Sequence, residues 1–298
     1  MDSLFIIGNG FDCVHELKTK YEDFKNFLIS KSDTINSDST KNTNDIIKLI
    51  IQTIDECTEP NWKNLEECLG NEFIDTIIYS NEWSYSITDI DEENIFHSVY
   101  ENENISLLLI NAYKILNSLF EEWVFNQLSS IDFKDVKKLK NTPSFNNSLF
   151  LSFNYTLTLE NLYHISSENI CHIHGKANDS TSHIYFGHGD DEEIEEIVQY
   201  IGISDAFNDL KKSLRKKTYQ AINENKYFFK KLTTIKNIYS YGFSFSDVDM
   251  VYLDEICSHI TTNKVTFFFN EYDWTNNKEF INKIKTLGFH VKKTDEWG

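Results

Sequence analysis

The chain has 298 residues, of which 40% are hydrophobic and 25% charged, and a formal net charge of -19. This length suits one or two globular domains with a sizeable core. The acidity argues against a surface devoted to duplex DNA or to an anionic membrane. Arg215 is the only arginine, so we expect backbone N–H groups, helix ends or lysines to hold any phosphate.

The chain has five cysteines and no C-x-x-C pair, so we expect no disulfide framework. The N-terminus does not read as a signal peptide, and we therefore expect a cytoplasmic protein. No apolar run approaches the length of about 18 residues that a membrane span needs.

The first half of the chain is expected to be mainly helical. Residues 4–7 form a short apolar run, which predicts a buried parallel strand. We expect a helix over residues 12–30 and a loop over the Ser-, Asn-, Asp- and Thr-rich residues 31–44. Helical apolar spacing follows at residues 45–56, 62–78 and 105–128. Residues 31–144 are therefore predicted to form a mainly helical insertion.

The pattern changes to alternating strands and helices after Pro143. Strands are expected at residues 148–153, 170–174, 183–186, 236–241, 264–270 and 289–292. Helices are expected at residues 156–163, 194–201, 247–259 and 276–287. Such alternation is typical of a doubly wound parallel sheet. The predicted fold is α/β: a Rossmann-like parallel sheet flanked by helices, in which residues 1–30 and 145–298 form a nucleotide-binding core.

Glycines follow many of the predicted strands. The six at strand ends are Gly8, Gly10, Gly175, Gly187, Gly189 and Gly242, out of ten in the chain. Ligands of open α/β sheets bind outside the carboxyl ends of the strands, where glycine allows close backbone approach. The alternative is that tight strand-to-helix turns need glycine in any protein.

Four polar turns carry the candidate chemistry. The first turn, Gly8 to Asp12, leads into a helix whose N-terminus can bind an anion. In this turn, Asp12 can cap the helix, bind a ribose hydroxyl or hold a catalytic water. In the second, Asn154 is either a ribose-binding amide or an ordinary turn residue. In the third, His174 is a candidate general base, whereas His172 is expected to be a core histidine. The fourth, residues 242–249, offers serine hydroxyls and Asp249.

Three further patterns have alternative interpretations. His172, His174, His188, Asp190 and Asp191 are residue types that suit Zn or Mn, but their spacing is not diagnostic. The acidic run 190–196 is expected to be the favourable first turn of a helix. The basic cluster 211–217 is expected to decorate a helix face, with a phosphate-rich partner as the alternative.

The chain resembles the bacteriophage abortive-infection AbiH family in five segments, which occur in the order IIGNGFD, SFNYTLTLE, HIHG, FGH and GFSFSDVD. In addition, Trp62-x-x-x-Glu66 is similar to that family's W-x-x-x-E element. That family in turn resembles sirtuin-like NAD-consuming proteins. The resemblance implies a phosphate loop at Gly8, Asn9, Gly10, Phe11 and Asp12. It also implies a ribose contact at Asn154, a catalytic role for His174, and a further loop element at Gly242 and Ser244.

What the resemblance implies is hydrolysis of the nicotinamide–ribose bond of NAD or a related nucleotide by an anti-phage effector, with no metal. No four-cysteine zinc module occurs, so lysine deacylation is not expected. The implied catalytic residues are Asn154, His174 and Asp12, with the Asp12 carboxylate close to the developing positive charge of the ribose. The expected ligand-binding residues are Gly8, Asn9, Gly10, Phe11, Tyr155, Thr156, Gly175, Gly242, Ser244, Ser246 and Asp249.

Two alternative functions follow from the same motifs. One is a metal-dependent phosphoesterase or nuclease that uses His172, His174, His188 and Asp190. The other is a non-catalytic nucleotide sensor that acts with a partner. A phage-derived trigger, a co-encoded protein and a second copy of the chain are the expected partners.

Overall fold

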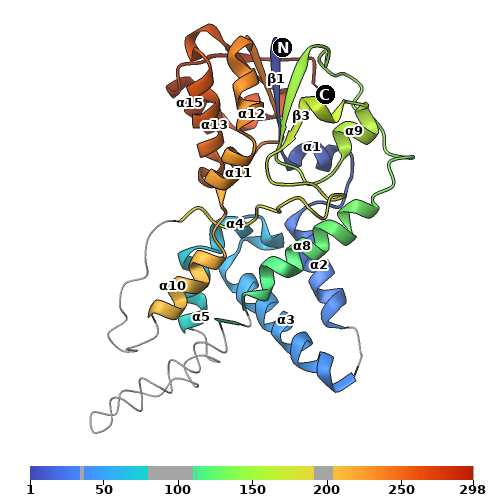
Figure 1. Cartoon of the computed structure of the whole chain (residues 1–298), viewed down its shortest axis with the longest axis vertical. Coiled ribbons are helices and arrows are strands. Elements are labelled where there is room, and N and C mark those ends of the chain that lie inside the picture. Colours follow the sequence, from blue (N-terminus) through green and yellow to red (C-terminus); the bar gives the residue numbers. More distant parts are fainter. Residues whose placement is uncertain (34–36, 80–109, 112, 191–203, 298) are drawn as a thin grey trace. The chain divides into compact units, whose positions relative to one another are not determined.

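The computed structural model describes residues 1–33, 37–79, 110–111, 113–190 and 204–297 (Figure 1). The chain divides into two compact units. We call residues 1–19, 124–185 and 217–298 the core unit, and residues 20–123 and 186–216 the helical unit. The sequence predicted an insertion over residues 31–144. The helical unit instead begins earlier and includes a second segment from the other half of the chain.

The described part of the core unit is built on one six-stranded sheet in the order β3-β2-β1-β4-β5-β6, and every neighbouring pair is parallel. The strands are β1 (Ser3–Ile7), β2 (Ser148–Ser152), β3 (Ile170–His172), β4 (Asn237–Tyr241), β5 (Thr266–Phe269) and β6 (His290–Lys293). The predicted α/β class with a parallel sheet flanked by helices is confirmed. The strand order changes direction between β1 and β4.

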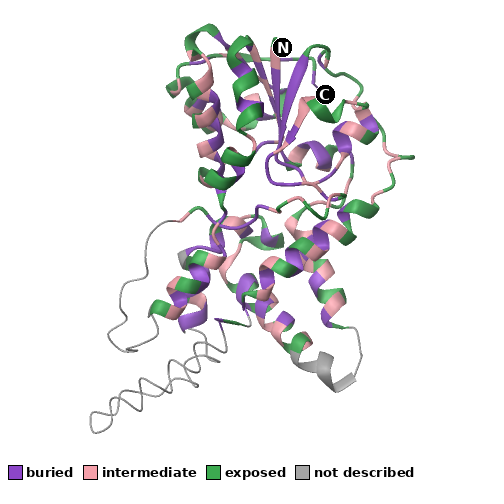
Figure 2. Ribbon diagram, in the orientation of Figure 1, coloured by how far each residue is buried: buried purple, intermediate pink, exposed green. Residues whose placement is uncertain are grey.

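Helices cover both faces of this sheet, and β1 and β2 are almost wholly buried (Figure 2). Buried and partly buried residues alternate in β3, β4 and β5, and β6 at the edge is mainly exposed. Side chains alternate along β1: Leu4 and Ile6 belong to one core, Phe5 and Ile7 to the other. The first core is closed by α11 (Thr218–Glu224), α12 (Lys226–Phe229), α13 (Asp247–His259) and α15 (Lys278–Thr286). The second is closed by α1 (Asn9–Val14), α9 (Thr158–Tyr163) and Trp297.

The remaining described elements of the core unit are short. They are η2 (Leu128–Ser130), η3 (Ser167–Asn169), η4 (Lys230–Thr234), η5 (Thr262–Lys264) and α14 (Glu271–Asn276).

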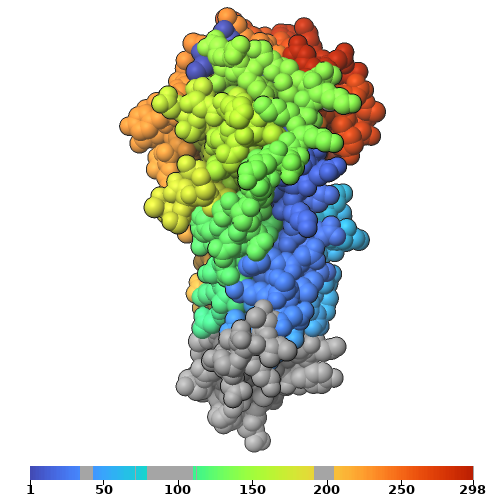
Figure 3. Space-filling view, turned by 90° about the vertical axis from the view of Figure 1, so that its right-hand side faces the viewer, coloured from blue at the N-terminus to red at the C-terminus, as the bar shows by residue number. Residues whose placement is uncertain are grey.

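Figure 3 shows one side of the surface of the core unit. Residues that follow α8 along the chain, coloured green to yellow, form much of this surface, and C-terminal residues, coloured red, lie beside them.

The helical unit has its own aromatic core. Its described elements are α2 (Tyr21–Ser32), α3 (Ser37–Cys57), η1 (Pro60–Trp62), α4 (Leu65–Cys68), α5 (Asn71–Tyr79), α8 (Ile115–Asn126, within this unit up to Trp123) and α10 (Ser204–Ser213). Phe120 stacks on Phe186 with ring centroids 3.8 Å apart, and Phe24 packs edge-on against Phe120 and Trp62. Large buried rings therefore supply much of this unit's hydrophobic stabilisation.

Two predictions about the helical unit were wrong. Cys57 and Cys68 form a disulfide between the end of α3 and α4, although no disulfide framework was expected. Lys211 and Lys216 of the basic cluster do not decorate a surface, because their side chains are only 4% and 1% exposed, whereas Lys212 and Lys217 are exposed as expected. They pair with Asp190 at 2.9 Å and with Glu66 at 3.0 Å.

Several predicted boundaries also differ. The helix expected over residues 12–30 is interrupted between α1 and α2, where Glu16 has a φ of 59°. Residues 37–44, expected to be a loop, belong to α3. The helix expected over residues 62–78 is divided into η1, α4 and α5, and positive φ at Asn61 and Trp62 accompanies the first of these breaks. Residues 183–186 have no regular secondary structure and do not belong to the sheet. Residues 105–109 and 194–201 lie outside the described residues.

None of the helices among the described residues has the length and hydrophobicity needed to span a lipid bilayer.

Candidate functional site

The structure brings the four polar turns together at the carboxyl edge of the core unit's sheet. They follow β1, β2, β3 and β4, and hydrogen bonds, an ion pair and ring contacts link each turn to another. Because parallel strands all end at this edge, residues that are far apart in sequence meet there. Gly187, Gly189, His188 and Asp190 belong instead to the helical unit.

The glycines of the first and fourth turns are packed against each other. A Cβ on Gly10 would lie 2.6 Å from the Gly242 Cα, and one on Gly8 would lie 2.4 Å from the Gly242 carbonyl oxygen. Gly242 itself has a φ of 65°, which favours glycine. The N–H groups of Gly8, Gly10 and Phe11 donate to the carbonyl oxygens of Tyr241, Gly242 and Gly8. Close packing of two turns therefore accounts for these glycines, and three N–H groups expected to face phosphates have backbone acceptors.

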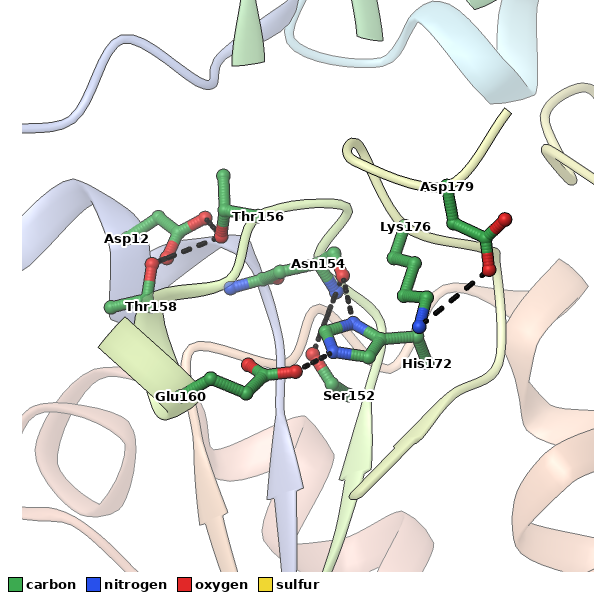
Figure 4. Close-up of polar contacts among 9 residues, drawn as sticks. All are labelled: Asp12, Ser152, Asn154, Thr156, Thr158, Glu160, His172, Lys176 and Asp179. Carbon is green, nitrogen blue, oxygen red and sulfur yellow. Dashed lines mark hydrogen bonds and ion pairs between the residues drawn. The ribbon is translucent and has the colours of Figure 1, made fainter. Parts of the chain in front are cut away.

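Asp12 joins the first turn to the second. Its side chain is fully buried and does not cap α1, whose N-cap is Gly8. Thr156 Oγ1 donates to Asp12 Oδ2 at 2.5 Å, and Thr158 Oγ1 donates to Oδ1 at 2.7 Å (Figure 4). Burial raises the pKa of Asp12 to about 6, although both threonine hydroxyls act in the opposite direction. The carboxyl group thus holds two turns together from inside the protein.

Asn154 lies in the second turn, directly after β2. Its residue is 6% exposed, and among the described residues neither polar atom of its side-chain amide completes a hydrogen bond. The amide lies close enough to Asp12 to lower that carboxyl's pKa, and its side chain extends toward Asp12 in Figure 4. Buried amide groups are normally hydrogen-bonded, so beyond its effect on Asp12 this side chain retains donor and acceptor capacity in the site.

The backbone of Asn154, in contrast, is held from two sides. His172 Nδ1 lies 3.1 Å from the Asn154 carbonyl oxygen, and His172 Nε2 lies 2.9 Å from Glu160 Oε1. Ser152 Oγ contacts both the N–H and the carbonyl oxygen of Asn154 at 3.3 and 3.4 Å. Both ring nitrogens of His172 are therefore engaged. The residue is a buried, satisfied histidine, as the sequence led us to expect.

His174 lies beyond the end of β3 in different surroundings from His172. It is 4% exposed, and its Nε2 lies 3.4 Å from Asp249 Oδ1 on α13. The rings of Phe153 and Tyr252 pack against it with centroids 5.1 and 5.5 Å away. Ser246 Oγ donates to Asp249 Oδ2 at 3.2 Å. A carboxylate beside a buried imidazole orients the ring and stabilises its protonated form.

The other expected ligand-binding residues have mixed environments. Tyr155 donates through its hydroxyl to the Tyr185 carbonyl oxygen at 3.0 Å. Gly175 has a φ of 90°, and a Cβ there would lie 2.2 Å from the His183 carbonyl oxygen. Asn9 is exposed and accepts a hydrogen bond from Thr19, and Ser244 is exposed.

The five candidate metal ligands are divided between the two units, since His172 and His174 belong to the core unit and His188 and Asp190 to the helical unit. No group of three or more His, Cys, Asp or Glu side chains arranged to hold a metal occurs among the described residues. His188 Nε2 faces the Lys211 carbonyl oxygen, and its Nδ1 accepts from the Asp190 N–H. Both nitrogens of His172 also have protein partners. Asp191 lies outside the described residues.

Three residues of the site were not identified from the sequence: Glu160, Thr158 and Tyr252. Glu160 and Thr158 lie in the segment that also carries Asn154, so their proximity to the second turn was a usable signal. Tyr252 follows Asp249 by one helical turn, which places both on the same side of α13.

Comparison with known proteins gives one match. The family described as bacteriophage abortive infection AbiH matches residues 4–271, which is nearly the whole chain. No curated protein and no solved structure matches the chain.

Proposed function

The chain belongs to the bacteriophage abortive-infection AbiH family, and we propose that it serves phage defence by binding NAD or a related nucleotide at the strand-end site and hydrolysing its nicotinamide–ribose bond. Consumption of such a metabolite would stop the growth of an infected cell. A cytoplasmic location, and activation by a phage-derived trigger, a co-encoded protein or self-association, are parts of the same proposal.

The Asn154 amide carries this proposal. Leaving a buried amide without hydrogen bonds costs about 1–3 kcal/mol, so its presence suggests a ligand that supplies the missing partners. An amide both donates and accepts, which matches a ribose hydroxyl or the attacking water. The backbone of Asn154 is held by His172 and Ser152, so the amide is positioned before a ligand arrives.

The strand order supports a nucleotide as that ligand. The order 3-2-1-4-5-6 is typical of sheets that bind dinucleotides at the point where the order reverses, and here this point lies between β1 and β4. The N–H groups of the first turn already have backbone acceptors. We therefore expect donors such as the exposed Ser244 hydroxyl to contribute to phosphate binding.

The proposed reaction assigns the proton to His174. Water attacks C1′ of the ribose, the C1′–N bond breaks, and its electron pair leaves with neutral nicotinamide. The attacking water loses a proton to the imidazole of His174, whose Nε2 faces Asp249 Oδ1 at 3.4 Å, and this carboxylate stabilises the resulting imidazolium. Aromatic rings around His174 exclude bulk water and strengthen this pairing.

Asp12 has a different role in this proposal from the one expected for it. Its carboxyl group is fully buried, and both oxygens accept threonine hydroxyls. We propose that it positions the Asn154 turn. The direct catalytic contact inferred from the sequence remains a prediction.

The test follows nicotinamide release from NAD by the purified full-length chain, alone and with extract of infected cells, each with and without a chelator. We expect chelator-insensitive release that is lost in Asn154→Ala and in His174→Ala. Asn161→Ala, an exposed asparagine on α9, is the matched control and should retain activity. Circular dichroism checks the fold of each variant.

Three outcomes would redirect the proposal. Release that requires a divalent ion would favour the metal-dependent alternative. NAD binding without release, in the presence of infected-cell extract, would favour a sensor. Absence of both binding and release would exclude NAD as the ligand.

A further inference from the structure

We propose that an exposed surface on α11, α12 and η4 binds single-stranded nucleic acid. We call it the Tyr–Lys surface, and its residues are Lys217, Tyr219, Lys226, Tyr227, Lys230 and Lys231. All six residues are exposed, and all belong to the core unit. The inference does not depend on the proposed hydrolysis.

The charge of this surface is opposite to that of the chain. Residues 217–236 contain five lysines and one acidic residue, Glu224, a net of +4, whereas the whole chain carries -19. Glu224 is engaged by Tyr185 and His183, and Lys236, outside the surface, pairs with Asp2 at 3.2 Å. Salt screens charges beyond about 8 Å at physiological ionic strength. A polyanion on this surface therefore experiences mainly the local positive charge.

Exposed aromatic rings accompany these lysines. Tyr219 and Tyr227 are 74% and 71% exposed, and only one other tyrosine among the described residues, Tyr272, is comparably exposed. The Nζ atoms of Lys226 and Lys230 lie 5.7 and 5.4 Å from the centroid of the Tyr227 ring. A flat ring flanked by cations offers a stacking surface for a base next to charges for the adjacent phosphates.

The surface is rigidly supported. Phe228 and Phe229, which directly follow Tyr227, are 8% and 0% exposed and belong to the first core of the sheet. Leu232, which directly follows Lys230 and Lys231 of η4, is buried in the same core. Ala221 anchors α11 in the same way. Because these buried residues fix the backbone, stacking a base on either tyrosine requires little additional ordering of the protein.

A single strand fits these observations better than a duplex or an acidic protein. Exposed rings stack on bases whose faces are free, and the bases of a duplex are already stacked on one another. An acidic peptide would use the lysines alone and leave the tyrosines without a role. Binding by this surface should therefore depend on both residue types.

The test is fluorescence anisotropy of the full chain with a labelled oligouridylate of about 20 nucleotides, at about 50 and 200 mM salt. We expect Tyr219→Ala/Tyr227→Ala to weaken binding by about tenfold or more. Lys226→Gln/Lys230→Gln should lower the slope of log affinity against log salt by about 1.4, or 0.7 for each lost phosphate contact. Tyr272→Ala is the matched control, because Tyr272 is 70% exposed but lies between Glu271 and Asp273.

Each result decides the proposal. Weakened binding in both double variants, with Tyr272→Ala unchanged, supports it. Equal binding of a matched duplex, or loss of binding in the lysine variant alone, would show a general polyanion site and overturn it. Unchanged binding in both double variants, or no binding at about 50 mM salt, would also overturn it. All the substituted side chains are exposed, and circular dichroism confirms that the variants fold.

Discussion

The buried carboxyl group of Asp12 should make stability fall as pH rises. Burial raises its pKa in the folded chain from 3.8 to about 6, so the folded chain binds a proton more tightly than the unfolded chain does. This contribution is fully present below pH 4 and is lost as pH rises to about 6. Because a tenfold difference in proton affinity corresponds to about 1.4 kcal/mol, the whole loss is about 3 kcal/mol.

Asp12→Asn cannot ionise, so it should remove this pH dependence. Urea unfolding followed by tryptophan fluorescence at low protein concentration gives the free energy of unfolding at pH 5.0 and pH 7.5. Between pH 5.0 and pH 7.5, the free energy of unfolding of wild type should fall by about 1.4 kcal/mol relative to that of the variant. Any constant cost of the substitution cancels in this comparison.

Asp179→Asn is a control without this pH dependence. Asp179 is partly exposed, and hydrogen bonds from Thr181 hold its pKa below 3.8, so it is ionised in both the folded and the unfolded chain between pH 5.0 and pH 7.5. The difference in unfolding free energy between wild type and Asp179→Asn should therefore stay constant over this interval. A difference between wild type and Asp12→Asn that stays constant with pH would refute the burial of this carboxyl group.

Three further variants test the packing. Gly10→Ala places a Cβ 2.6 Å from Gly242 and should cost about 1–3 kcal/mol in chemical unfolding; an unchanged midpoint would contradict the contact between the two turns. Trp297→Ala removes a ring that packs on Phe5 and Tyr241, and should cost about 3–5 kcal/mol. Cys57→Ser should destabilise the helical unit by about 2–4 kcal/mol because it removes the disulfide to Cys68, and mass spectrometry of the unreduced wild type checks that disulfide.

The sheet could be predicted from the sequence because its strands have local signals. β1 and β2 are continuous apolar runs, as expected for strands buried on both faces. The polar composition of residues 37–44 favoured a loop, but the adjacent amphipathic segment already forms a helix, and extending a helix is easier than starting one. The break between α1 and α2 depends on a positive φ at Glu16, a non-glycine residue, and no local sequence pattern indicates this backbone conformation.

The location of the site was predictable, but its pairings were not. Turns that follow parallel strands must meet at one edge, so Asn154 and His174 were expected to be neighbours. The pairing of His174 with Asp249, and of His172 with Glu160, depends on the path of each turn and on side-chain rotamers. Packing of Gly10 on Gly242 joins residues from distant parts of the chain, so the sequence suggested a ligand contact where the structure has a backbone contact.

The most direct test of the central claim compares wild type with Asn154→Ala in two measurements on the same samples: calorimetric titration with NAD and thermal unfolding. If the unused amide serves a ligand, the variant should bind NAD at least about tenfold more weakly and unfold at the same or a higher temperature, because a buried amide without partners has been removed. Equal NAD affinity in the two proteins, or a clear loss of thermal stability in the variant, would show that this amide is structural and would contradict the proposed site.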